Sequence, residues 1–270
     1  MKLFLQKRAS KWLCLALLLL AFSSVAEETL LPDATYELMP LVTLREGETV
    51  RLAASSSYYS GEPIYKGNTG LTLSGACALH SASVVITNLT GAVVSGQEVT
   101  AANNRDIRSA SNWVNYVAWG KLATRYQVDF QSFNMAQYSA NLKNHGFRTD
   151  ERRHNKLETL AEALDVYGGS AGVILHFNQS GQQNGDGHRH VVVLLGYIMK
   201  NSEVTDLLIS DSSVPAPQGA CVRLSESSLP LSMLGKKALA KAEEAGDNLA
   251  LRMMDYIVSY RYITKALTEE

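Results

Sequence analysis

The sequence lacks the features of several common classes of protein. Its formal net charge is −1 over 270 residues, and no run of one sign is long enough to predict binding to nucleic acid or to a charged membrane surface. No apolar stretch after residue 26 is long enough to span a bilayer, so we expect no stable membrane insertion of that part of the chain. Internal repeats and long low-complexity tracts are also absent. The chain is long enough for one domain of ordinary size with a substantial apolar core.

Cysteine is also scarce. Of the three cysteines, Cys14 lies in the apolar N-terminal run, so export would leave Cys77 and Cys221. Two cysteines in an exported protein are enough for one disulfide, and the sequence leaves this pairing open. The alternative is a reactive thiol at Cys77, which lies at the predicted start of an apolar helix, where the helix dipole favours a thiolate. A third possibility is a regulatory disulfide that masks this thiol until it is reduced.

A recognisable metal site is missing as well. Four histidines could supply nitrogen ligands: His80, His176, His188 and His190. Carboxylates or cysteines at the spacing of common metal sites do not accompany them. We therefore expect neither a bound metal ion nor a cofactor.

Residues 1–26 have the pattern of a signal peptide. Basic residues precede an apolar run from Trp12 to Phe22, and the small residues Ser24 to Ala26 form a typical cleavage site. The apolar run is short for a transmembrane span, although an uncleaved anchor is the alternative. We expect export to the periplasm or to the outside of the cell, with a mature chain that begins at Glu27.

Residues 27–70 and 71–270 differ in composition. The first segment alternates short apolar pieces with serine, glycine and proline, and we interpret it as a β-rich leader whose role as a pro-segment stays open. The second segment contains the longer periodic patterns. These predict helices over 77–89, 109–126, 134–145, 156–167 and 232–245, and strands over 171–177, 190–199, 206–210, 221–224 and 254–262. Most helices precede the strands, which predicts an α+β fold rather than alternating βαβ units.

Three residues could form the site of a thiol enzyme. Cys77 starts an apolar helix, His190 opens a buried strand, and Asp211 closes the next strand along the chain. Adjacent antiparallel strands bring the start of one beside the end of the next, so His190 and Asp211 can meet. A thiol needs an imidazole to ionise it, and the imidazole needs a carboxylate or amide to fix its tautomer. His188 is the main alternative base but belongs to a predicted loop, and we expect His80 to point along its helix rather than across a cleft.

Around these residues the chain resembles the papain-like cysteine peptidase superfamily, in its compact bacterial branches. The resemblance covers roughly residues 75–229 and depends most on residues 187–197, GHRHVVVLLGY, followed by Ile209-Ser210-Asp211. These segments are similar to the histidine strand and the aspartate strand of peptidases that process double-glycine leaders. Phytochelatin synthases are a second resemblance, which includes the tyrosine seven residues beyond the histidine, here Tyr197.

The resemblance implies a papain-like α+β fold for residues 71–270. In that fold a buried N-terminal helix that carries the cysteine packs against an antiparallel sheet that carries the histidine and the aspartate. By the same resemblance Cys77 would be the nucleophile, His190 the base and acid, and Asp211 the residue that orients the histidine.

The chain departs from the family's pattern around the oxyanion hole. The relatives usually carry a glutamine six residues before the cysteine, and Leu71 occupies that position here. Asn68, Thr72 or Ser74 could supply a replacement donor, and the backbone N–H of Cys77 remains available. Because loss of a side-chain donor can lower the rate by orders of magnitude, an inactive or regulated descendant is an alternative.

These observations predict an exported thiol hydrolase that cleaves a peptide or amide bond through Cys77, His190, Asp211 and an acyl-enzyme. One alternative is a transpeptidase similar to phytochelatin synthase, in which glutathione supplies a gamma-glutamylcysteine acyl group. Another is an inactive papain-like scaffold with a disulfide between Cys77 and Cys221. The expected partner is therefore a peptide or a small thiol-peptide substrate, and we expect loops 55–70 and 178–189 to form the rims of its cleft.

Overall fold

The described part of the chain belongs to one of two units, Tyr36–Glu270. The computed structural model describes residues 36–37, 42–52, 57–58, 76–92, 94, 112–169, 171–212 and 221–266. The predicted signal peptide, most of the loop 55–70 and the region around Leu71 lie outside these residues.

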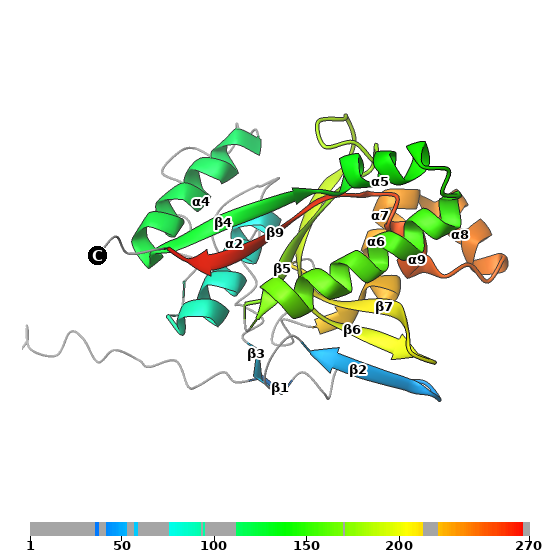
Figure 1. Cartoon of the computed structure of the whole chain (residues 1–270), viewed down its shortest axis with the longest axis horizontal. Helices are drawn as coiled ribbons and strands as arrows, with labels where there is room; N and C mark the ends of the chain where they lie inside the picture. The colour runs from blue at the N-terminus through cyan, green and yellow to red at the C-terminus, as the bar shows by residue number, and fades with distance from the viewer. Residues whose placement is uncertain are drawn as a thin grey trace, which may run out of the picture. The chain divides into compact units, whose positions relative to one another are not determined.

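Seven strands form one antiparallel sheet in the order β4-β9-β5-β6-β7-β8, and β2 also pairs with β6 (Figure 1). The strands are β2 (Glu48–Leu52), β4 (Val128–Asn134), β5 (Val173–Asn178), β6 (Arg189–Lys200), β7 (Glu203–Ser210), β8 (Cys221–Arg223) and β9 (Ile257–Lys265). A separate antiparallel pair joins β1 (Tyr36–Glu37) to β3 (Ser57–Tyr58). The fold is therefore α+β with an antiparallel sheet, as the sequence predicts.

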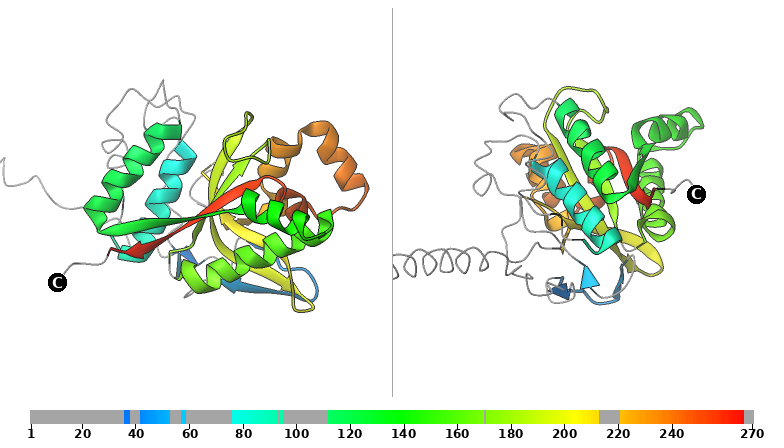
Figure 2. Two further views of the ribbon diagram at one scale, coloured as in Figure 1. Left: turned by 45° about the horizontal axis from the view of Figure 1, so that its top comes forward. Right: turned by 90° about the vertical axis from the view of Figure 1, so that its left-hand side faces the viewer.

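The helices pack on this sheet in two groups. The described helices are α2 (Ala76–Thr90), α4 (Asn112–Tyr126), α5 (Met135–Asn144), α6 (Thr149–Ala163), the π-helical turn η3 (Leu164–Gly168), the 3-10 turn η4 (Leu224–Glu226), α7 (Leu229–Leu234), α8 (Lys236–Glu244) and α9 (Leu249–Met253). Helices α2 and α4 lie side by side in both views of Figure 2 and contribute to one apolar cluster. Helices α6, α7 and α9 contribute to a second cluster.

The central strand β6 carries apolar side chains on both of its faces. Val191, Val193 and Leu195 belong to the cluster that contains α2 and α4. The residues between them, Val192 and Leu194, belong to the cluster that contains α6 and α9. A strand that is covered on both faces does not alternate apolar with polar residues. This packing explains the uninterrupted apolar run that the sequence has at this strand.

Most predicted elements are present, but several predictions need correction. Helix α6 begins at Thr149 rather than at residue 156, and helix α9 was absent from the prediction. The helix predicted over 232–245 is divided into α7 and α8 at Gly235, whose φ of +75° is unfavourable for a residue with a side chain. Strand β4 was missing from the prediction, although it pairs with β9 over its whole length. Its exposed side chains give a weak apolar pattern, with only Val128 fully buried.

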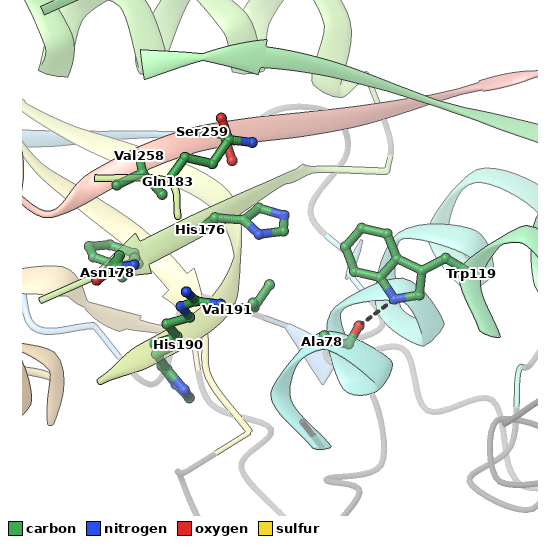
Figure 3. Close-up of a pocket in the computed structure, with 11 residues that line it drawn as sticks. Ala78, Trp119, His176, Asn178, Gln183, His190, Val191, Val258 and Ser259 are labelled. Carbon is green, nitrogen blue, oxygen red and sulfur yellow. Dashed lines mark hydrogen bonds between the residues drawn. The ribbon is translucent and has the colours of Figure 1, made fainter. Parts of the chain in front are cut away.

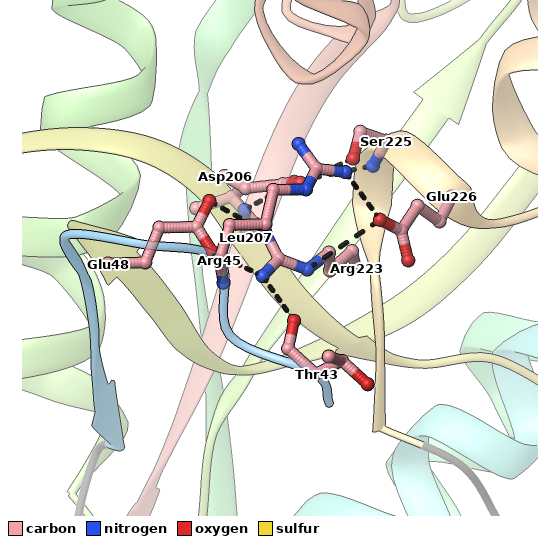
Figure 4. Close-up of polar contacts among 8 residues, drawn as sticks. All are labelled: Thr43, Arg45, Glu48, Asp206, Leu207, Arg223, Ser225 and Glu226. Carbon is pink, nitrogen blue, oxygen red and sulfur yellow. Dashed lines mark hydrogen bonds and ion pairs between the residues drawn. The ribbon is translucent and has the colours of Figure 1, made fainter. Parts of the chain in front are cut away.

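A buried ion pair fastens the segment 42–52 to the sheet (Figure 4). Arg223 Nη2 lies 2.5 Å from Glu48 Oε2 and donates to the carbonyl oxygen of Thr43 at 2.7 Å. The side chains of Arg223 and Glu48 are 3% and 6% exposed. The hydrogen bond from Arg223 lowers the pKa of Glu48 to about 2, against the opposing effect of burial. Because a buried charge is tolerated only when it is paired, this contact ties β2 firmly to β8.

Candidate active site

The fold brings the three predicted site residues together from three separate elements. Cys77 is the second residue of α2, His190 is the second residue of β6, and Asp211 directly follows β7. Strands β6 and β7 are antiparallel neighbours, with Val193 opposite Ser210. The start of β6 therefore lies beside the end of β7, as the order of the strands in the sequence predicts.

His190 and Asp211 form a short hydrogen-bonded pair. His190 Nε2 lies 2.7 Å from Asp211 Oδ1, a length typical of a hydrogen bond assisted by charge. The side chain of His190 is 12% exposed, and that of Asp211 is wholly buried. Since Nε2 is engaged by the carboxylate, Nδ1 is the ring nitrogen left for a third partner.

That third partner is the Cys77 thiol, which is partly exposed at the start of α2. Burial raises the pKa of Cys77, but the opposing contacts outweigh it and the net pKa is lowered. These contacts are the hydrogen bond and the charge of His190, and hydrogen bonds from the backbone N–H groups of Val191 and Ala78. Each of them stabilises the thiolate rather than the thiol.

The pKa of His190 moves in the opposite direction. Burial lowers it, but the hydrogen bonds to Asp211 and to Cys77, with the charges of both groups, raise it to about 10. A lowered thiol pKa and a raised imidazole pKa together favour a thiolate beside an imidazolium at neutral pH. This is the activated state of a nucleophilic cysteine.

The second cysteine lies in a contrasting environment. Cys221 is completely buried in β8, and burial raises its pKa to about 12. Both cysteines are free thiols, so the structure does not contain the disulfide that the sequence left open. Of the two described cysteines, only Cys77 has the surroundings of a reactive thiol.

Two residues that support the start of α2 were not identified from the sequence. His80 is buried and its Nε2 lies 3.3 Å from Ser210 Oγ, so it reaches β7 instead of pointing along its helix as predicted. Trp119 Nε1 donates to the carbonyl oxygen of Ala78 at 3.0 Å (Figure 3). A lone histidine on an otherwise apolar helix was the available signal for His80, whereas nothing in the sequence pairs Trp119 with residue 78.

The other histidines have different roles. His188 is exposed in the β5–β6 loop, and its ring centroid lies 6.4 Å from that of His190. His190, not His188, makes the contact with Asp211. His176 lies on β5, where its ring packs edge-on against Trp119 at 5.8 Å. Within the described ranges, no group of three histidine, cysteine or acidic side chains is suited to hold a metal ion.

A small cavity of about 70 Å³ lies directly beside His190. Its walls include Ala78 of α2, His176 of β5 and Ser259 of β9 (Figure 3). Arg189 of β6 also lines it. His190 itself lines the cavity, together with Ala78, which follows Cys77 in α2, and Arg189, which precedes His190 in β6.

Tyr197, which the resemblance to phytochelatin synthases includes, lies away from these residues. Its hydroxyl donates to Asp165 Oδ2 at 2.9 Å, and its ring belongs to the apolar cluster on the α6 side of the sheet. Burial and the hydrogen bond to Asp165 raise the pKa of Tyr197 to about 12. Its environment is that of a structural tyrosine.

Comparison of the sequence with protein-family models and with curated proteins finds no match. Among the described residues, no helix is both long and apolar enough to cross a membrane.

Proposed function

We propose that the chain is an exported thiol hydrolase of papain-like fold, which cleaves a peptide or amide bond through Cys77, His190 and Asp211. One observation carries the proposal: a chain of hydrogen bonds that runs from a thiol through an imidazole to a buried carboxylate. The opposite pKa shifts of Cys77 and His190 support it, because they describe a nucleophile and a proton donor in contact.

In the first half of the proposed reaction, the Cys77 thiolate attacks the carbonyl carbon and the negative charge moves to the carbonyl oxygen. The C–N bond then breaks, and the His190 imidazolium gives its proton to the departing amine. The products of this half are a free amine and a thioester on Cys77. Asp211 holds the Nε2–H of His190 throughout and keeps Nδ1 directed at the reacting atoms.

In the second half, neutral His190 takes a proton from water, and the resulting hydroxide equivalent attacks the thioester. The C–S bond breaks, the carboxylic acid leaves, and the thiolate–imidazolium pair is restored. If the amino group of another molecule, such as that of glutathione, attacked in place of water, the same thioester would yield a transpeptidation product. The two outcomes differ in product mass, which separates the hydrolase from the transpeptidase.

The test is alkylation of the native protein with iodoacetamide over a range of pH, read by mass spectrometry at each cysteine. We expect fast labelling of Cys77 below pH 7 and slow labelling of buried Cys221, which serves as the control within the same molecule. His190→Ala should slow the labelling of Cys77 on the order of a hundredfold at pH 6, since a thiol of ordinary pKa is less than about 1% ionised there.

Slow and equal labelling of both cysteines would refute the proposal and favour an inactive scaffold. Labelling that begins only after a reductant is added would favour the disulfide instead. Fast labelling justifies a search for substrates with peptide mixtures, in which Cys77→Ala is the inactive control.

A further inference from the structure

We propose that the cavity beside His190 binds a carboxylate group of the substrate and that Arg189 determines this specificity. This inference depends on the proposed function for its biological meaning, but it concerns a separate set of side chains. Arg189 directly precedes His190 on β6 and lines the cavity.

The size of the cavity limits what it can accept. Its volume of about 70 Å³ is well below the roughly 300–1,000 Å³ of pockets that hold drug-sized ligands. It can therefore receive one small group, such as a carboxylate or an amide at the end of a side chain or of a peptide. A large aromatic side chain would not fit.

The charge of the cavity favours an anion. Arg189 is a lining residue, and none of the residues that line the cavity is acidic. A second guanidinium, that of Arg261, lies 5.1 Å from the ring centroid of Trp119, which forms one wall. One guanidinium therefore lines the cavity, a second lies against the Trp119 wall, and no acidic side chain is among the lining residues.

Most N–H groups of the Arg189 guanidinium make no hydrogen bond within the described part of the chain. Its Nη2 donates to the carbonyl oxygen of Gly185 at 3.0 Å, and no carboxylate of the described residues forms an ion pair with it. A guanidinium has five N–H groups in a planar fork that matches the two oxygens of a carboxylate. One hydrogen bond to a loop carbonyl leaves most of this fork available.

Neutral side chains around the cavity can complete the contact. Gln183 Oε1 accepts from Asn134 Nδ2 at 3.0 Å, which leaves the amide NH₂ group of Gln183 as a donor. His176 Nε2 is buried without a hydrogen-bond partner among the described residues. Burial and the charge of Arg261 lower the pKa of His176 to about 3, so its ring is neutral and can donate one N–H. The Ser259 hydroxyl lines the same cavity.

The carboxylate could belong to an acidic side chain or to a peptide's C-terminus, and three matched reagents distinguish these sources. They are N-chloroacetyl-glutamic acid α-amide, N-chloroacetyl-glutamine with a free α-carboxylate, and N-chloroacetyl-glutamine α-amide, which has no carboxylate. Each alkylates a thiol with loss of chloride, so the rate of labelling at Cys77 reports recognition without requiring turnover.

We expect one of the two acids to label Cys77 about tenfold to a hundredfold faster than the neutral amide, the range expected for a hydrogen-bonded charge pair. Arg189→Gln should abolish this preference, and Arg189→Lys should retain part of it because the charge remains. Lys143→Gln, which removes an exposed positive charge from α5, is the matched control and should retain all of it. Iodoacetamide should label the four proteins at similar rates, which separates a defect in the cavity from a defect in the thiol.

Equal labelling by all three reagents in the wild-type protein would overturn the inference, as would an acid preference that survives Arg189→Gln. If iodoacetamide reveals no activated thiol, the proposed function fails on its own account. The cavity is then tested by NMR titration of Cys77→Ala protein with the three acetylated counterparts. The inference is overturned there too if neither acetylated acid binds, or if Arg189→Gln does not weaken the binding.

Discussion

Two buried pairs of opposite charge lie along the sheet, and they differ in what they can do. His190 and Asp211 are joined at 2.7 Å, and Arg223 and Glu48 at 2.5 Å. In both pairs the carboxylate is almost removed from water, with side-chain exposures of 0% and 6%. By burial and distance alone, the two pairs are equivalent.

The difference lies in the partner of each carboxylate. A guanidinium does not lose its proton at ordinary pH, so the Arg223–Glu48 pair keeps one charge state and fastens β2 to the sheet. An imidazole exchanges its proton readily, and the second ring nitrogen of His190 contacts the Cys77 thiol. A buried ion pair is therefore weak evidence for a site until a titratable partner and a reactive neighbour accompany it.

The largest effect should come from breaking the Arg223–Glu48 pair. Arg223→Met leaves the Glu48 charge buried without its partner, which we expect to destabilise the fold by about 3–5 kcal/mol. Urea unfolding measures this loss. Labelling of Cys77 in the folded variant should keep the wild-type rate, because Arg223 does not contact the site. The double variant Glu48→Gln/Arg223→Met should recover much of the stability. Slower labelling of Cys77 in either variant would show that the two pairs are coupled.

The two pairs should also respond to opposite ends of the pH scale. The pKa of Glu48 is about 2 in the folded protein, against an ordinary value of 4.5. Its contribution of about 3 kcal/mol is fully present above the unfolded pKa and is lost as the pH falls from 4.5 toward 2. Thermal unfolding at a series of pH values should therefore show a steep acid loss that is shallower in Glu48→Gln.

The pKa of His190 is raised, so the sign is reversed. The stabilisation from its imidazolium is fully present below the unfolded pKa of 6.5 and is lost as the pH rises toward 10. His190→Ala should flatten this alkaline decline and leave the acid limb unchanged. An alkaline decline that His190→Ala does not alter would contradict the raised pKa.

Asp211→Asn should have a smaller effect, confined to the site. The amide oxygen can still accept from His190 Nε2, but the negative charge that favours the imidazolium is gone. We expect the labelling of Cys77 at pH 6 to fall about tenfold, since loss of one nearby charge changes a pKa by about one unit or more. An unchanged rate would mean that Asp211 only positions the ring.

Much of the fold and the positions of the three site residues could be predicted from local patterns. Strand β6 has an uninterrupted apolar run, and α2 has a long apolar helical segment. Both elements are present where predicted. The meeting of His190 with Asp211 followed from the antiparallel order of two successive strands. Strand β4 was missed because six of its seven residues are not fully buried, which leaves little pattern to detect.

The cavity could not be predicted, because its walls come from residues far apart in the chain. Trp119, His176 and Ser259 lie on three different elements, and only the pairing of β5 with β9 and the packing of α4 bring them together. The same reason explains His80, whose partner Ser210 lies 130 residues away. Local patterns identify which residues are buried, whereas the contacts between distant elements decide which of them meet.

The smallest effect should come from Ser210→Ala, which removes the hydroxyl that contacts His80 next to Asp211. Ser83→Ala is the matched control, because Ser83 is also buried and its hydroxyl donates to the carbonyl oxygen of Val94 at 2.8 Å, from the same helix as His80. Each change should cost about 1 kcal/mol in urea unfolding.

Only Ser210→Ala should slow the labelling of Cys77, by a few-fold, since the contact between His80 and Ser210 joins α2 to the strand that ends at Asp211. Equal labelling rates in the two variants would limit this contact to a structural role. A slower rate in Ser210→Ala at equal stability would make His80 a positioning residue, which links the helix that carries the thiol to the carboxylate of the pair.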